Sequence, residues 1–361
     1  MSRLREGWGV LAATALVVAV VAQGASAAPA PVADYQFHDN RSSSVPGAPG
    51  ITDVGSGNTF VTEGVAGCST RALAFPQHNG LSLDTSGLRT GFPISETIVI
   101  DFRLADVSGY RRLIQTADTT DDSGLYVRAG RLDWYDAGTG SHEGGPVIAP
   151  DTDVEVALIQ SAILDRWGMF GFVNGVQQFN FTSDFEVGPQ LRLFKDNQGG
   201  VEDSAGAVFR VRFWKTSLVP ADIPAIYSAS LLGNPSSCPG AEAKANRKPR
   251  AVVSAYGGVS VDTGITAACP DAGVICSVDI SVTGGGAKKS KSSVLASGHV
   301  DLPAGISQSA TIVLNKRGKK LLLKRGKAKI TATVSATGPN GKPAIATSSG
   351  KVKQPHSKKR R

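Results

Sequence analysis

Short apolar runs separated by turn residues recur through the first part of this chain, and one of them strongly predicts a β-hairpin. In WGMFGFVNGVQQFNF, apolar residues lead into Asn174 and Gly175 and resume after them. Both residues accept the positive φ of a two-residue hairpin turn, so this pair between apolar runs is a strong hairpin signal. GLYVRAGRLDWYD has the same character, with its turn at Ala129 and Gly130. Because no long stretch shows helical periodicity, the sequence predicts an all-β protein.

Charge divides the chain into two parts. From Pro239 to Arg361 there are 22 Lys and Arg residues against 5 Asp and Glu, a net charge of +17. The residues before Pro239 carry 16 Lys and Arg against 25 Asp and Glu, a net charge of −9. An acidic part and a basic part favour two domains, and the chain is long enough for both.

The domain boundaries follow from composition. Segment 234–250 is rich in Pro, Ala and charge and has no periodicity, so it is predicted to be a linker. It would join a domain at 28–233 to a basic β domain at 251–353. The last residues, 354–361, form a basic tail with nothing apolar to pack.

The N-terminus has the three parts of a secretory signal peptide, predicted at 1–27. A basic start precedes an apolar run from Val10 to Val21, and small residues precede a cleavage site expected after Ala27. The apolar run is shorter than the ~20 residues that a membrane-spanning helix needs. We therefore expect a secreted, extracellular protein with no transmembrane segment after cleavage, either released or associated with the cell wall.

Four cysteines are expected to form two disulfides, since disulfides persist outside the cell. Four cysteines allow three connectivities. Cys269 and Cys276 enclose only the loop PDAGVI, so they pair most economically with each other. That leaves Cys68 to pair with Cys238, which would tie an early strand to the end of the first domain.

The order of several segments before residue 230 resembles bacterial laminin-G-like domains. ADYQFHDN, RALAFPQHNGLSL, TIVIDFRL, SGLYVRAGRLDWY, FVNGVQQ, LRLFKDNQGGVEDSAGAVFRVRFW and SLVPADIPAIY follow one another as in that family. The resemblance implies a concanavalin A-like jelly-roll sandwich of two curved antiparallel sheets. The second part resembles the immunoglobulin-like modules of secreted actinobacterial proteins, including a hairpin at LNKRGKKLLLKRGKAKI, and implies a small immunoglobulin-like β-sandwich.

Three acids alternate with other residues in PDTDVEVALI, the pattern of a catalytic strand. Laminarinase-type glucanases, which share the concanavalin A-like fold, carry Glu-x-Asp-x-Glu on one strand. By that resemblance Glu155 would be the acid/base, Asp153 the middle carboxylate and Asp151 would stand in place of the nucleophile. Asp is one methylene shorter than Glu, and retaining geometry needs carboxyl groups about 5 Å apart. We therefore expect a solvated strand edge after a turn, with a glucanase-type glycoside hydrolase as the alternative.

Two acidic loops are candidate calcium sites. Calcium takes six or more oxygen ligands, and both loops offer carboxylates or amides. The candidate ligands are Asp118, Asp121, Asp122, Asp196, Asn197, Glu202 and Asp203. Neither loop has the spacing of a dedicated calcium loop, and Asp and Asn are also ordinary turn residues, so calcium stays open as a cofactor.

Aromatic and basic residues suggest binding partners. Trp134 and Tyr135 are neighbours on a predicted strand, so one ring should face the core and the other should face outward, where it can stack on a sugar. Together with Asp151, Asp153 and Glu155 they are the candidate ligand-binding residues.

Eight basic residues crowd the second part within one predicted hairpin: Lys316, Arg317, Lys319, Lys320, Lys324, Arg325, Lys327 and Lys329. Such a patch binds polyanions without reading a nucleic-acid sequence. Export favours an anionic envelope polymer or an acidic surface as the partner over genomic DNA. A charged, solvated face that keeps the protein soluble is the alternative.

The sequence thus predicts a secreted, non-catalytic binding protein. We expect a first domain that recognises carbohydrate or a protein surface and a basic module that associates with the cell envelope. The sequence contains no Gly-x-Ser-x-Gly elbow and no His pair at metal spacing. A structural surface protein without a soluble ligand is a further alternative.

Overall fold

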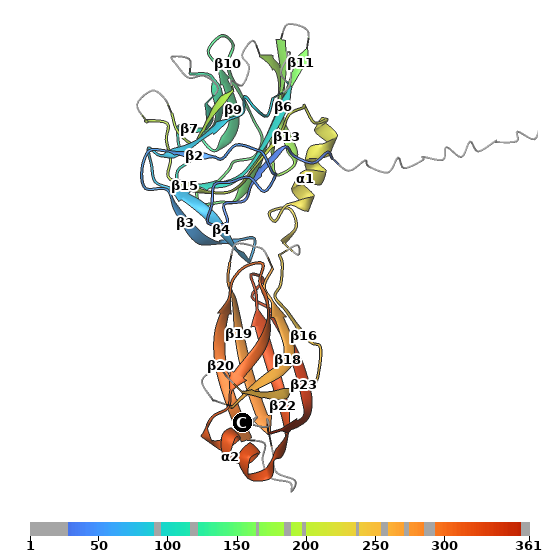
Figure 1. The fold of residues 1–361 in the computed structure, drawn as a ribbon. Helices are drawn as coiled ribbons and strands as arrows, with labels where there is room; N and C mark the ends of the chain where they lie inside the picture. The colour runs from blue at the N-terminus through green and yellow to red at the C-terminus, as the bar shows by residue number, and fades with distance from the viewer. Residues whose placement is uncertain are drawn as a thin grey trace, which may run out of the picture.

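The computed structural model describes residues 28–89, 95–115, 122–163, 166–183, 189–196, 200–235, 238–253, 259–270, 274–284 and 293–354. The predicted signal peptide and the tail after residue 354 lie outside these ranges. The described chain is nearly all β, as predicted, and forms two β-sandwiches in succession (Figure 1).

Two antiparallel sheets build the first sandwich. The larger sheet contains β1 (Ala33–Tyr35), β3 (Thr59–Val65), β4 (Cys68–Phe75), β6 (Glu96–Leu104), β11 (Val154–Ile163), β12 (Arg166–Val173), β13 (Val176–Ser183) and β15 (Gly206–Trp214). The smaller sheet contains β2 (Thr52–Val54), β5 (Gly80–Asp84), β7 (Tyr110–Gln115), β8 (Gly124–Arg128), β9 (Arg131–Asp136), β10 (Gly140–Gly144) and β14 (Gln190–Leu193). Their strand orders are β13-β12-β11-β6-β15-β4-β3, with β1 beside β15, and β10-β9-β8-β7-β14-β5-β2.

The two predicted hairpin turns are confirmed. Asn174 and Gly175 join β12 to β13 with φ of 50° and 77°, and Ala129 and Gly130 join β8 to β9 with φ of 46° and 80°. The inward residues of both sheets, among them Trp134, form one apolar core. This core fixes which side chains of each strand point outward.

A short helix covers part of the outer face of the larger sheet. The turn η1 (Pro220–Asp222) leads into α1 (Ile223–Ala229), which buries Ile223 and Ile226 against Trp214 and Ile159. The helix ends where the backbone N–H of Ser230 bonds to the carbonyl of Tyr227. Strand β11 is therefore apolar on both faces over most of its length, because one face packs on the core and the other lies beneath α1.

The second sandwich also has two sheets. One contains β16 (Glu242–Ala245), β17 (Arg250–Val253), β18 (Val259–Ala268) and β21 (Ser307–Val313). The other has the order β20-β19-β22-β23 and contains β20 (Ser293–Leu302), β19 (Cys276–Gly284), β22 (Lys327–Thr337) and β23 (Pro343–Lys353). Their inward residues form a second core that shares no residue with the first.

The structure differs from the sequence predictions at two places in this part. Residues 242–245 of the predicted linker form β16, because they pair with residues 265–268 of β18. The predicted hairpin at 314–330 is wrong: helix α2 (Lys316–Arg325) occupies most of it. The Asn315 side chain caps the helix by accepting from the N–H of Gly318 at 2.9 Å, Gly326 ends it in the left-handed conformation, and Leu322 packs into the second core.

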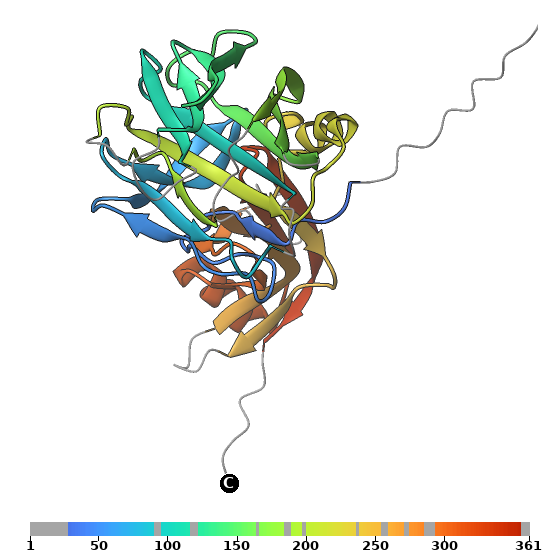
Figure 2. The same cartoon turned by 90° about the horizontal axis from the view of Figure 1, so that it is seen from above.

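Both expected disulfides are present and one of them lies at the junction. Cys68 bonds to Cys238, and Cys269 bonds to Cys276. Next to the first bond, the N–H of Ser69 on β4 donates to the carbonyl of Pro339 in the β22–β23 turn at 3.0 Å. The second sandwich thus meets the first at one end, and α2 lies at its far end (Figure 1). Seen from above, the first sandwich lies over the second (Figure 2).

Candidate functional site

The three acids of the catalytic-strand pattern do not form one group. Asp151 lies in the turn before β11 at φ 54°, and its N–H donates to the carbonyl of Leu104 at 2.8 Å. Asp153 accepts a 2.7 Å hydrogen bond from Nε of Arg103. Glu155 lies on β11 itself, which is an internal strand between β12 and β6.

Glu155 is a buried side chain with an internal partner. It is 1% exposed, and its Oε2 accepts a 2.7 Å hydrogen bond from Nη2 of Arg212, which also donates to Asp101 at 3.3 Å. Asp101 is the cross-strand neighbour of Glu155 on β6. Burial, and then the nearby Asp101 carboxylate, raise the pKa of Glu155 to about 7.

The expected solvated strand edge is therefore wrong for Glu155. The Asn174–Gly175 turn closes the adjacent hairpin, and the N–H of Glu155 donates to Oδ1 of Asn174. A Cβ on Gly175 would come 3.1 Å from Tyr227 of α1, so hairpin and helix are in close contact. A carboxyl group enclosed in this way and paired with arginine does not face a substrate cleft.

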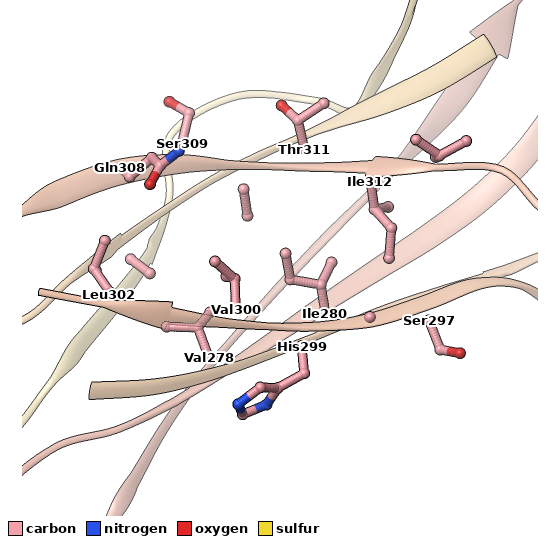
Figure 3. Close-up of a pocket in the computed structure, with 14 residues that line it drawn as sticks. Val278, Ile280, Ser297, His299, Val300, Leu302, Gln308, Ser309, Thr311 and Ile312 are labelled. Carbon is pink, nitrogen blue, oxygen red and sulfur yellow. The ribbon is translucent and has the colours of Figure 1, made fainter. Parts of the chain in front are cut away.

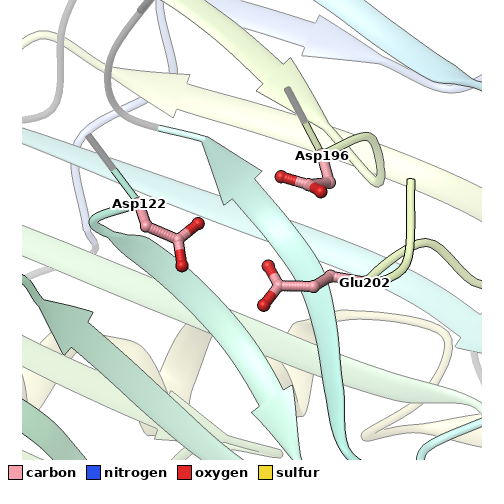
Figure 4. Close-up of side chains that lie close together, drawn as sticks. All are labelled: Asp122, Asp196 and Glu202. Carbon is pink, nitrogen blue, oxygen red and sulfur yellow. The ribbon is translucent and has the colours of Figure 1, made fainter. Parts of the chain in front are cut away.

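The candidate calcium ligands are only partly brought together. Carboxylate oxygens of Asp122, Asp196 and Glu202 lie within 4.8 Å of one another (Figure 4). Asp118, Asp121 and Asn197 lie outside the described residues. Asp203 is not one of these three carboxylates, although its Oδ1 accepts from the backbone N–H of Asp196 at 2.6 Å. Its Oδ2 accepts from Nζ of Lys195 at 2.8 Å and lies 3.2 Å from Nδ1 of His78.

A guanidinium group already occupies the centre of the acidic cluster. Nη2 of Arg112 lies 2.6 Å from Asp122, 3.3 Å from Asp196 and 3.1 Å from Glu202. The Arg112 side chain has no exposed surface, and its Cζ lies 4.0 Å from the ring centre of Tyr126. These carboxylates neutralise an arginine, so they do not fit a calcium site.

The neighbouring residues Trp134 and Tyr135 point to opposite faces of β9, as expected for a strand. Trp134 has no exposed surface and belongs to the core, so it is not available to a ligand. Tyr135 points to the outer face of the smaller sheet, where it meets two aromatic neighbours that the sequence reasoning missed. The rings of Tyr110, Tyr126 and Tyr135 lie 5.4 to 6.4 Å apart in edge-to-face contacts.

The tyrosine cluster, which we define as Tyr110, Tyr126 and Tyr135, carries charged neighbours. Arg128 lies 5.0 Å from the ring centre of Tyr110, and the buried Asp133 is the cross-strand neighbour of Tyr126. Burial raises the pKa of the Asp133 carboxyl. The strand spacing brings the three rings together, and a search for tyrosines on the outward positions of successive strands would have found them.

The basic residues gather at the far end of the second sandwich. We call this surface the basic end and define it by its exposed lysine and arginine side chains: Lys316, Arg317, Lys320 and Lys324 of α2, and Lys327, Lys329, Lys351 and Lys353 of the sheet. On the sheet, Lys327 is directly opposite Lys353, and Lys329 is directly opposite Lys351. Within the described residues, none of these side chains takes part in an ion pair. The sequence reasoning named Lys327 and Lys329 but missed their partners on β23.

An apolar groove opens between the two sheets of the second sandwich (Figure 3). Its volume is about 350 Å³, and Ile280, Leu302 and Ile312 are among its lining residues. It runs between β20 and β21, which are edge strands of their sheets. No part of the described chain occupies it.

No family model and no curated protein matches this chain. Among solved structures, domain 4 of AbnA, a GH43 extracellular arabinanase from Geobacillus stearothermophilus solved with arabinotriose, has a TM-score of 0.42 at 12% identity, covering 55% of this chain and 99% of that one. The Ruminococcus gnavus IT-sialidase CBM40 bound to α2,3-sialyllactose has a TM-score of 0.34 at 16% identity, covering 43% and 96%. The ligand-binding domain of botulinum neurotoxin serotype D, solved with N-acetylneuraminic acid, has a TM-score of 0.42 at 7% identity, covering 90% and 96%. Similarities of this size assign no family.

Two observations bear on location. Two disulfides in one chain are typical of extracellular proteins. Among the described residues, no helix has the length and apolar character to cross a bilayer.

Replacing Arg112 should destabilise the protein strongly. Arg112→Met leaves three carboxylates without their cation, and breaking a buried ion pair costs about 3–5 kcal/mol. Arg41→Met, which breaks the more exposed pair with Asp53, should cost at most about 1 kcal/mol. Chemical denaturation measures the loss of unfolding free energy in both variants.

Addition of calcium should leave the thermal midpoint of the unchanged protein where it is. A clear rise in that midpoint would show that the cluster of Asp122, Asp196 and Glu202 binds the ion after all.

Glu155 should make stability fall as the pH rises. Its folded pKa of about 7 lies above the ordinary value of 4.5, so between these values the folded protein holds a proton that the unfolded chain releases. At 1.36 kcal/mol per pKa unit the loss across this window is about 3–4 kcal/mol. Glu155→Gln should remove most of it, as measured by urea unfolding at several pH values. Glu63→Gln, which changes a partly exposed glutamate on the same sheet, should keep the original dependence. An unchanged dependence in Glu155→Gln would refute the assignment.

Proposed function

We propose that this chain is a secreted, non-catalytic binding protein that associates with anionic polymers of the cell envelope through its basic end. The observation that carries the proposal is the pairing of Lys327 with Lys353 and of Lys329 with Lys351. Like charges directly opposite each other on neighbouring strands are destabilising. An anionic partner removes this repulsion, so the arrangement favours a bound polyanion.

The charge pattern of the two sandwiches supports this assignment. In the first sandwich, the buried acids Glu155 and Asp101 share Arg212 as an ion-pair partner within the fold. At the basic end, the exposed lysines have no such partner among the described residues. Charges that the fold does not neutralise are the ones available to another molecule.

Non-catalytic action is the second element of the proposal. The glucanase alternative requires Asp151 and Glu155 to face one substrate. In the structure Asp151 lies in a turn, and Glu155 is enclosed beneath α1 and bonded to Arg212. This geometry supports a structural role for both.

Carbohydrate recognition by the first sandwich is the third element. Tyr126 is the buried member of the tyrosine cluster. The partly exposed rings of Tyr110 and Tyr135 lie on the outer face of the smaller sheet, with Arg128 as a hydrogen-bond donor beside them. Aromatic faces next to polar groups suit sugar rings. The cluster therefore supports binding of a neutral or acidic sugar at this face.

Binding to purified bacterial cell wall tests the first element. The unchanged protein should sediment with the wall at low salt and remain in solution at high salt, because salt screens the attraction. Replacing Lys320, Lys324, Lys329 and Lys351 by Ala should reduce wall binding at least tenfold. Replacing Lys244 and Lys342, which lie away from the basic end, should leave it nearly unchanged. Retention that ignores salt would contradict the electrostatic mechanism.

A glycan array tests the third element, with a reducing-sugar assay on laminarin and lichenan run in parallel. We expect sugar binding that Tyr135→Ala reduces about tenfold, and no release of reducing sugar. Tyr227→Phe on α1 is the matched control and should bind as the unchanged protein does. Hydrolysis that Glu155→Gln abolishes would overturn the non-catalytic assignment.

A further inference from the structure

The outer face of the β19–β20–β22–β23 sheet carries a regular array of hydroxyl groups beside the lysine pairs. Directly after the pair Lys329 and Lys351, Thr331 is opposite Ser349, and Thr333 is opposite Thr347. Oγ1 of Thr331 and Oγ of Ser349 lie 2.9 Å apart. On the other side of β22, Thr283 and Ser281 of β19 are the cross-strand neighbours of Thr331 and Thr333.

Strand geometry fixes the spacing of this array. Neighbouring strands lie about 4.7–4.9 Å apart, and residues on the same face of one strand repeat every ~6.6–6.8 Å. A chain molecule that lies along β22 and β23 therefore meets two positive pairs in succession and then two hydroxyl pairs. The order of the groups along the strands is charge, charge, hydroxyl, hydroxyl.

The far end of the same face limits the array. Asp279 and Asp301 flank His299, whose ring nitrogens lie 2.9 Å and 3.2 Å from their carboxylates. These acids repel a polyanion that extends beyond the hydroxyl rows. A hollow of about 450 Å³ lies at this acidic end, lined by Asp279 and His299 and also by the hydroxyl residues Ser281, Thr333 and Ser335.

The chemistry of the donors suits a phosphate polymer that carries hydroxyl groups. The described positive groups on this sheet face are lysines, whose compact ammonium groups bind phosphate as point charges. Arginine, whose planar fork binds carboxylate or phosphate in bidentate fashion, is absent from the described rows, so binding here depends on point charges and on the hydroxyl groups. The serine and threonine hydroxyls donate and accept hydrogen bonds, so they suit a ligand that also carries hydroxyl groups.

We propose that this sheet face binds a linear polyol phosphate polymer. Its phosphodiester groups lie on the pairs Lys327–Lys353 and Lys329–Lys351, and its free hydroxyl groups bond to the rows of Thr331 and Thr333. The inference rests on the proposed envelope association and names the polymer class and the surface that recognises it. Helix α2 adds positive charge at the same end but takes no part in recognising the hydroxyl groups.

The test measures binding of the full mature chain to poly(glycerol phosphate), inorganic polyphosphate, polyglutamate and dextran by titration calorimetry at fixed low salt. We expect poly(glycerol phosphate) to bind at least about tenfold more tightly than polyglutamate of matched charge, and dextran not to bind. Lys329→Ala with Lys351→Ala should weaken binding of both phosphate polymers about tenfold.

The hydroxyl rows are tested by variants that keep shape and strand propensity. Thr331→Val with Thr333→Val should weaken binding of poly(glycerol phosphate) about fivefold and leave binding of polyphosphate unchanged, since polyphosphate has no hydroxyl groups along its chain. Thr311→Val, on the other sheet of this sandwich, is the matched control and should bind both polymers as before. Thermal unfolding of each variant verifies that it is folded.

Two results separate this inference from the proposed function. Equal affinity for poly(glycerol phosphate) and polyglutamate, or no effect of the threonine variants, would overturn the polymer class while polyanion binding stands. Absence of binding to every anionic polymer and to cell wall would overturn both.

Discussion

Buried arginine–carboxylate contacts determine what the charged residues of this protein are free to do. Arg112 is enclosed by three acids on the smaller sheet of the first sandwich, and Arg212 joins Glu155 to Asp101 on the larger one. Such groups are stable in a low-dielectric interior only when each charge has a partner. The acidic residues that look most like a catalytic or metal site are therefore ion-pair partners of arginines within the fold.

The sequence predicts well what depends on neighbouring residues. The turns at Asn174–Gly175 and Ala129–Gly130, the all-β class and the short disulfide loop all follow from local pattern or short separation. It predicts poorly what distant segments decide. Glu155 is buried because α1, more than 60 residues later, covers its strand, and Arg112 reaches Glu202 across 90 residues. The pattern of residue types along one strand does not predict such contacts with distant segments.

Helix α2 shows a different kind of error. The resemblance to immunoglobulin-like modules implied a hairpin, yet Asn315 and Gly326 stand where helix caps belong, and Leu322 supplies a buried contact. The cap residues were readable in the sequence. The register of β22 and β23 was not, and it is this register that places Lys327 opposite Lys353 and reveals a surface with unbalanced charge. The two sandwiches thus differ in how their charges are placed. Arg112 and Arg212 of the first are buried and paired with acids, whereas the lysines at the end of the second are exposed and lack an ion-pair partner among the described residues.

Lysine acetylation followed by mass spectrometry, with and without cell-wall polymer, tests this difference most directly. The account predicts that the polymer protects Lys327, Lys329, Lys351 and Lys353 from modification. It predicts that Lys244 and Lys342, away from the basic end, react equally in both conditions. Uniform protection of all lysines, or protection that leaves the paired lysines of β22 and β23 unchanged, would contradict the account.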